Sequence, residues 1–172
     1  MTHEEFQSAA NYWIIKDKDS VRLDPAALRA AVEAYIAENN TCALATGFGD
    51  FVRCTPIEYS YHDGAFWIFS EGGEKFLALE HNANVCLAIY DRYGSPQGLR
   101  GMQVTGVAEM VEPFSEPYNA HAAHRKVSME FLKKLSSPMN LIKIRPVRID
   151  FLCSAFKKEG ASPRQSLLLE EG

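Results

Sequence analysis

Short apolar runs separated by turn signals dominate the chain, and they constrain the fold more than any other feature. The runs read TCALATG, FVRCTPIEYSY, AFWIFS, NVCLAIYD, MQVTGVAEMVE and, near the C-terminal end, LIKI followed by VRIDFLCSAF. Few helical patterns lie between them, so strand and helix do not alternate as they do in a parallel sheet. We therefore expect a β-barrel with peripheral helices, α+β in composition and mainly β.

Individual residues indicate where these strands turn or become irregular. His62, Asp63 and Gly64 form a hairpin turn signal. Pro56 cannot donate to a strand ladder, so its strand should lie at an edge or contain a bulge. Gly106, inside a strand pattern, predicts a bulge or bend. The run NVCLAIYD is continuously apolar, which is typical of a buried strand.

Three helices are expected. Asp24 and Pro25 form a helix start, and apolar residues recur at helical spacing until Asn39 and Asn40. A short helix is expected from about Glu74 to His81. A third pattern, EPYNAHAAHRKVSMEFLKKL over residues 116–135, predicts a single helix. The polar tail, residues 157–172, is expected to be mobile or to dock on a partner.

Length and composition favour one globular domain over residues 1–172, with its core at 41–153. Hydrophobic residues make up 47% of the 172 residues, and the net charge of -4 gives no general attraction to nucleic acid or anionic lipid. No apolar run approaches the ~18 residues of a membrane helix. The polar, acidic N-terminus lacks the pattern of a secretory signal, so we expect none. We therefore expect a cytoplasmic protein with no membrane or nucleic-acid partner.

Cysteine and histidine patterns predict no metal site. The four cysteines include no C-x-x-C pair and mostly lie in apolar runs, which favours buried, inert thiols in a reducing compartment (Cys42, Cys54, Cys86 and Cys153). His121 and His124 could share a helix face and bind metal, but a solvated helix face is the favoured interpretation. Glu58 could act as an acid or base, although a surface or cross-strand partner is favoured.

The stretch SEGGEK, residues 70–75, is the candidate binding site. No Gly-Lys-Ser/Thr loop, G-x-G-x-x-G motif or nucleophile elbow is present. Gly72 and Gly73 would let the backbone approach a phosphate, Lys75 would add a charge at a helix N-terminus, and Ser70 could cap that helix or bond the phosphate. Arg53 could reach the same point. A plain turn with a solvated lysine is the alternative.

The order of motifs over about residues 41–112 resembles the FMN-binding split-barrel superfamily of pyridoxamine 5'-phosphate oxidase. The resemblance consists of a strand pair, an arginine opening the second strand, a hairpin, a strand ending in a small polar residue, a turn with a basic residue, and a short helix. It implies an antiparallel, Greek-key split β-barrel with peripheral helices. It also implies FMN as cofactor, bound between the subunits of a homodimer.

The resemblance assigns cofactor-binding roles to eight residues. Arg53 and Lys75 match the cations that bind the FMN phosphate, and Cys54, Thr55 and Pro56 match the segment along the edge of the isoalloxazine ring. Phe69 and Ser70 match the strand end that holds the ribityl and phosphate groups. Gln103 lies in the strand that approaches the flavin, although the family's glutamine aligns nearer Gly101.

Three departures separate this chain from the B6 oxidase itself. Glu58 stands where the oxidase has a lysine after the strand with the arginine. Glu74 precedes Lys75 where the family has a basic pair, and residues 145–172 contain no counterpart of the motif that grips pyridoxine phosphate. The expected activity is therefore that of an FMN-dependent oxidoreductase with an unassigned substrate and no assigned acid or base. The alternatives are a flavin- or haem-binding protein without turnover, the same barrel with a deazaflavin, and a structural barrel without cofactor.

Overall fold

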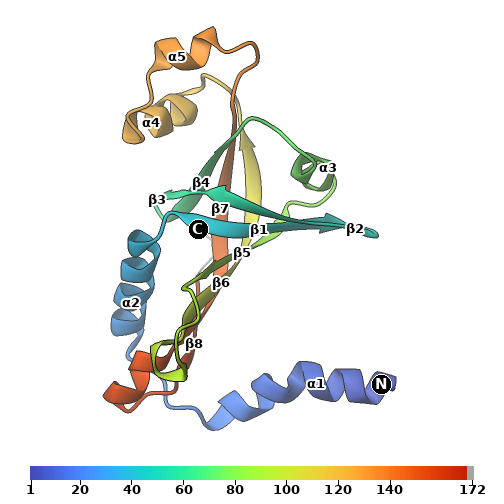
Figure 1. Cartoon of the computed structure of the whole chain (residues 1–172), viewed down its shortest axis with the longest axis vertical. Helices are drawn as coiled ribbons and strands as arrows, with labels where there is room; N and C mark the ends of the chain where they lie inside the picture. Colours follow the sequence, from blue (N-terminus) through green and yellow to red (C-terminus); the bar gives the residue numbers. More distant parts are fainter. Residues whose placement is uncertain (170–172) are drawn as a thin grey trace.

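The computed structural model describes residues 1–169, and these form an antiparallel sheet of eight strands with helices around it (Figure 1). The strand order is β2-β1-β5-β6-β7-β4-β3, and β8 pairs with β7 beside this path. The strands are β1 (Thr41–Phe48), β2 (Phe51–Glu58), β3 (Ser60–His62), β4 (Ala65–Ser70), β5 (Asn84–Tyr90), β6 (Arg100–Val111), β7 (Asn140–Cys153) and β8 (Arg164–Leu168). The expected mainly β, antiparallel barrel architecture is confirmed.

Strand β7 divides the sheet. Along one edge it pairs with β6 over nearly its whole length. Along the other edge its first part, residues 140–144, pairs with β4, and its later part, residues 148–152, pairs with β8. The runs LIKI and VRIDFLCSAF thus contribute to one strand of fourteen residues.

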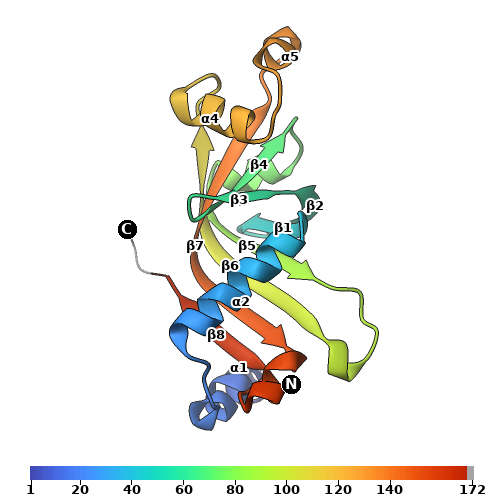
Figure 2. The same ribbon diagram turned by 90° about the vertical axis from the view of Figure 1, so that its left-hand side faces the viewer.

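Helix α2 (Pro25–Glu38) covers one face of the sheet (Figure 2). The Asp24 carboxylate caps it by accepting hydrogen bonds from the backbone N–H groups of Ala26 and Ala27, as the sequence predicts. Its buried residues, Leu28, Val32, Tyr35 and Ile36, form one helical stripe. They pack on strand residues such as Val85, Leu87, Val104 and Ile149, which make the main core.

The sheet has one buried and one open face, which corrects the prediction of a buried strand at 84–91. Along β5, Val85, Leu87 and Ile89 are buried, whereas Cys86 and Ala88 are partly exposed and Tyr90 is exposed. This alternation is the pattern of an antiparallel sheet with a core on one side. The second side is therefore a surface on which a ligand or partner could bind.

Two predicted irregularities are confirmed. Strand β2 is an edge strand of the sheet, so the missing N–H of Pro56 is tolerated. The β6–β7 register shifts between Thr105 and Gly106. A Cβ at Gly106 would lie 2.8 Å from the Arg145 carbonyl oxygen and 2.8 Å from Ile144 Cγ2. Glycine is required there by this close backbone approach.

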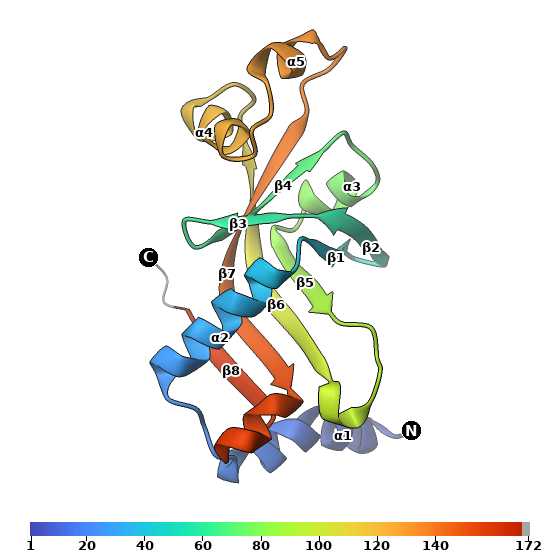
Figure 3. The same ribbon diagram turned by 60° about the vertical axis from the view of Figure 1, so that its left-hand side comes forward.

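The single helix predicted at 116–135 is wrong, because two helices form. These are α4 (Glu116–His124) and α5 (Met129–Lys134), at the opposite end of the sheet from the N-terminal helix (Figure 3). Lys126 has a φ of 55° and breaks the first helix, and Ser128 caps the second by accepting from Phe131 N–H. Both helices pack on a second, smaller apolar cluster with Trp67 and Leu141.

The two ends of the chain differ from expectation. Residues 157–169 are not a mobile tail, because the short helix η3 (Ser154–Glu159) and strand β8 tie them to β7; residues 170–172 of that tail lie outside the described residues. At the other end the helix α1 (His3–Lys16), which was not predicted, is followed by the short helix η1 (Asp17–Asp19). No helix among the described residues is long and apolar enough to span a membrane.

Candidate functional site

The open face of the sheet collects three of the predicted cofactor residues. Paired residues of adjacent strands lie on the same face. Pro56 pairs with Ala43, Ala43 with Ala88, Ala88 with Gln103, and Gln103 with Asp150. A parallel row begins at Cys54 and continues through Ala45, Cys86, Thr105 and Arg148. Cys54, Pro56 and Gln103 therefore share one surface, although they come from two strands far apart in the sequence.

The middle of this surface consists of small side chains. Ala43, Ala45, Cys86 and Ala88 contribute little height above the backbone, so a flat aromatic ring system could lie against them. Below this floor, the same face of β5, β6, β7 and β8 borders a cavity of about 860 Å³. Gln103, Arg148 and Asp150 line it, and Arg148 donates to Asp150 through Nε and Nη2.

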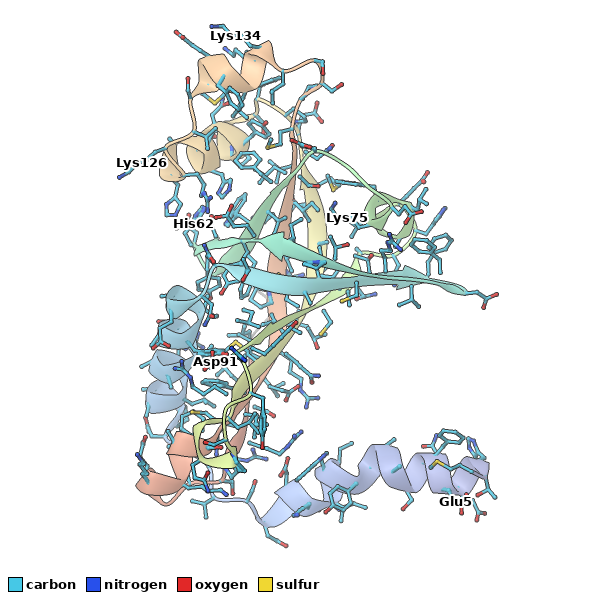
Figure 4. The ribbon with its side chains drawn as sticks, in the orientation of Figure 1. Glu5, His62, Lys75, Asp91, Lys126 and Lys134 are labelled. Atoms are coloured by element: carbon cyan, nitrogen blue, oxygen red, sulfur yellow. The ribbon has the colours of Figure 1, made fainter. Side chains whose placement is uncertain are left out.

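Lys75 is the most unusual residue of the site, because a lysine is rarely buried without a charged partner. Only 5% of it is exposed, and its ammonium donates to the Gly72 carbonyl oxygen (Figure 4 labels Lys75). Burial lowers the pKa of Lys75. Gly72 and Gly73 both have positive φ, 158° and 107°, and a Cβ at Gly73 would lie 3.5 Å from Lys75 Nζ. The two glycines thus shape the turn around the ammonium group.

Arg53 reaches the same turn but is engaged by a carboxylate. Its Nη2 lies 2.8 Å from Oε2 of Glu74, and both side chains are more than half exposed. An anion that bound between Arg53 and Lys75 would compete with Glu74. The helix that follows, α3 (Lys75–Leu79), has five residues instead of the eight expected, so its dipole adds little.

Ser70, Thr55 and Phe69 occupy less direct positions. Ser70 Oγ donates to the Gly72 carbonyl and accepts from the Gly72 N–H, so it braces the turn and does not cap α3. Thr55 shares a face with Arg53, opposite to Cys54 and Pro56. The Phe69 ring packs on Tyr118 and His121 under α4, so a contact of Phe69 with a cofactor would involve its backbone.

The residues fit a planar, phosphate-bearing group, although Glu74 places a negative charge beside the phosphate position. The small-residue floor accommodates a ring, and the glycine turn with its buried ammonium accommodates a phosphate. Thr46, paired with Arg53, has a buried hydroxyl oxygen that lacks a hydrogen-bond partner among the described residues. Glu74 reduces the positive charge of the turn and would have to release Arg53.

The remaining candidates from the sequence are structural. Glu58 forms a surface ion pair with Arg125, at 3.0 Å, as favoured. The prediction of a solvated face for His121 is wrong: His121 is 1% exposed, and its Nδ1 lies 2.9 Å from Nε2 of His62. The described residues contain no group of ligands able to hold a metal ion. All four cysteines are free, and Cys54 is exposed rather than buried.

Comparison of the structure with solved structures places the chain among split-barrel proteins. A FAD-binding protein from Mesorhizobium loti is similar at a TM-score of 0.58 and 19% identity, over 70% of this chain and 89% of that one. HutZ, a heme storage protein from Vibrio cholerae, is similar at a TM-score of 0.56 and 19% identity, over 73% of this chain and 90% of that one. General Stress Protein 26 from Bacillus anthracis is similar at a TM-score of 0.56 and 20% identity, over 83% of this chain and 98% of that one.

The sequence makes the assignment more specific. The profile of the pyridoxamine 5'-phosphate oxidase family matches residues 28–153, so the chain belongs to this family. A search among curated proteins finds no match. The resemblance stated from the motif order is confirmed at the level of family and fold.

Proposed function

We propose that the chain is an FMN-binding oxidoreductase that holds its flavin between two copies of the protein. The observation that carries the proposal is the buried Lys75 ammonium in the Gly72–Gly73 turn, next to Arg53 and the small-residue face. A flavin phosphate carries nearly two negative charges, and two cations with backbone donors suit it. Membership of the pyridoxamine 5'-phosphate oxidase family supports the same cofactor.

The roles of the residues follow from their positions. Lys75 and Arg53 would bind the phosphate, with Ser70 holding the turn in shape. Cys54 and Pro56 would border the ring, and Thr55 would contribute through its backbone. Gln103, on the open face, would approach the ring from the adjacent strands. FMN would supply the hydride or electron transfer, while the protein binds, orients and shields it.

A haem-binding protein without turnover is the second candidate. The similarity in fold to HutZ, which is described as a heme storage protein, supports it. His81 and His124 are exposed side chains that could approach a haem iron. The glycine turn and buried lysine have no evident use in that case, which is why flavin is the first candidate.

The absorbance spectrum of the purified protein, before and after addition of FMN, tests the proposal. We expect twin flavin bands that co-elute with a dimer in gel filtration. A Soret band would favour haem, and a single dominant band would favour a deazaflavin. A colourless protein that does not retain added FMN would contradict the flavin proposal and leave SEGGEK as a turn. Bound flavin that passes electrons to no acceptor would favour a storage or sensing role.

A further inference from the structure

The N-terminal helix α1 has an apolar stripe that nothing in the described chain buries. None of its fourteen residues is buried, and Phe6 and Ile14 are 60% and 64% exposed. Its apolar residues recur at i, i+3, i+4, i+7 and i+8, namely Phe6, Ala9, Ala10, Trp13 and Ile14. This spacing is typical of a helix that packs on another surface. A solitary helix of this length is marginal in water, so the stripe needs a partner.

The base of α1 is fixed to the body, and its free end points away from it. The Arg164 guanidinium lies over the Trp13 ring, 4.3 Å from its centroid, and Arg22 donates to the Asp17 carbonyl at 3.3 Å. Glu5, near the other end, lies far from the sheet (Figure 4). The helix therefore forms an arm with a defined direction, on the side of the sheet opposite to α2 (Figure 1).

The surface that matches this arm is the open face of the same sheet. Trp13 and Ile14 line the cavity of about 860 Å³ together with the exposed faces of β5 to β8. Helix α2 covers the other face of the sheet (Figure 2), whereas the open face meets α1 at Trp13 and Ile14. A chain that has both the apolar stripe of α1 and a sheet face that matches it can form an isologous contact, in which α1 of each copy packs on the sheet of the other.

We propose that α1 packs against the open sheet face of a second copy of the chain, and that the second copy returns its own α1. The proposal rests on the homodimer of the proposed function and specifies which surfaces form it. Covering the large apolar side chains of one arm removes roughly 500 Å² from water. Two arms, together with the sheet surface that each arm covers, bring the total buried area to about 2,000 Å², the size of a stable interface.

Charge favours a second copy over a membrane surface. The free half of α1 carries Glu4 and Glu5, and its basic residue, Lys16, is at the fixed end. Helices that lie on anionic membranes are instead rich in lysine and arginine. Arg148 and Asp150 of the open face pair with each other at 2.8 Å, so we expect the contact with α1 to be mainly apolar.

Light scattering coupled to gel filtration, over a dilution series, tests the arm. The variant combines Phe6→Asp with Ile14→Asp, and the matched control is Phe131→Asp, because Phe131 is 55% exposed on a helix at the other end of the molecule. We expect the arm variant to raise the dimer dissociation constant at least tenfold and the control to leave it unchanged. Far-UV circular dichroism checks that both variants fold.

Trp13 gives an independent reading in a Trp67→Phe background, where it is the remaining tryptophan. Its emission should shift to the blue as concentration rises through the dissociation constant. An equal dimer dissociation constant in wild type and arm variant would contradict the proposed role of α1 but not the homodimer itself. A monomeric wild type would overturn both, and its binding to anionic vesicles would identify a membrane helix. FMN retention, read by absorbance, tests the cofactor separately.

Discussion

Lys75 combines a positive charge with almost complete burial, and the contacts around it are few. Its ammonium donates to the Gly72 carbonyl and lies 5.0 Å from the centroid of the Phe76 ring. A buried cation without an anionic partner is costly, and the lowered pKa of Lys75 expresses that cost. An arriving phosphate would supply the missing charge. The residue is thus the most direct place to test the cofactor.

Lys75→Met should weaken FMN binding by tenfold or more. Methionine keeps most of the side-chain volume but removes the charge and the hydrogen-bond donor. Fluorescence titration with FMN measures the dissociation constant. Lys134→Met, at an exposed position on α5, is the control and should leave it unchanged. An unaltered affinity in Lys75→Met would refute the phosphate assignment.

Glu74→Gln should have the opposite effect and tighten FMN binding several-fold. The substitution removes the carboxylate that holds Arg53 at 2.8 Å, so the guanidinium becomes available to the phosphate. The same titration measures it, and the difference should shrink at high salt because the charges are exposed. Glu80→Gln, at a neighbouring side chain that is 73% exposed, serves as the comparison. Weaker binding in Glu74→Gln would place the phosphate elsewhere.

The sequence predicted the cations of the site better than their surroundings. Arg53 and Lys75 are recognisable from motif order, and both lie at the glycine turn. The pairing of Arg53 with Glu74 and the rotation of Phe69 under α4 depend on tertiary packing. The small-residue floor was missed because Ala43 and Ala88 become neighbours only through strand register. Alternating small residues in both strands were the available signal.

At the level of elements, the bulge between β6 and β7 is the clearest constraint. Gly106→Ala should lower the free energy of unfolding by about 2 kcal/mol, because the added methyl would overlap backbone and side-chain atoms 2.8 Å away. Urea denaturation measures the change. Gly94→Ala is the matched control, since nothing lies within 4 Å of its Cβ position, and it should change stability by less than about 0.5 kcal/mol. Equal effects would mean that the bulge relaxes.

Helix α4 is held to β3 and β4 by stacked aromatic and imidazole rings. The His62 ring stacks on Trp67 at 4.9 Å between centroids, and His121 stacks on Trp67 at 5.3 Å (Figure 4 labels His62). The pKa of His121 is lowered from 6.5 to about 4. Burial is the largest cause, and the nearby charges of His62, Arg125 and His124 act in the same direction. Asp63 accepts from His62 Nδ1 at 2.8 Å, which leaves His62 Nε2 to accept from His121.

This arrangement predicts a loss of stability in mild acid. Between pH 6.5 and about 4 the unfolded chain binds a proton at His121 and the folded chain does not, so stability falls as pH falls through this window. The loss should reach about 3 kcal/mol. Urea denaturation at several pH values measures it. His121→Phe should remove most of this dependence, whereas His81→Gln, at an exposed side chain, should retain it. A pH profile unchanged by His121→Phe would contradict the assignment.

Which elements could be predicted depends on the range of the forces that form them. Asp24 and Pro25 start α2 by local capping, so the sequence predicts its beginning correctly. The break at Lys126 requires a lysine in a left-handed conformation, for which no local signal exists. Strand β8 forms because β7 offers it a free edge, which composition does not reveal. Rules based on local sequence fail for the break at Lys126 and for β8, because tertiary contacts determine the backbone conformation there.

For the molecule as a whole, a bound cofactor should raise thermal stability. A ligand that binds the folded form alone adds about 2.7 kcal/mol at one hundred times its dissociation constant. FMN should therefore raise the melting temperature by several degrees in a thermal unfolding assay, and FAD or haem at the same concentration should raise it less. The largest shift with haem would reverse the order of the two proposed functions. Lys75→Met should lose most of the shift caused by FMN.

The three partners of β7 also determine when the chain can fold during synthesis. This strand is bonded to β6 on one edge and to β4 and β8 on the other, yet it begins at residue 140. Until the ribosome has released that segment, β4 and β6 have no strand between them, and the pairings of β7 with β4, β6 and β8 are missing. Folding therefore waits for the C-terminal fifth of the chain, and the exposed apolar strands before it are those a nascent-chain chaperone would protect.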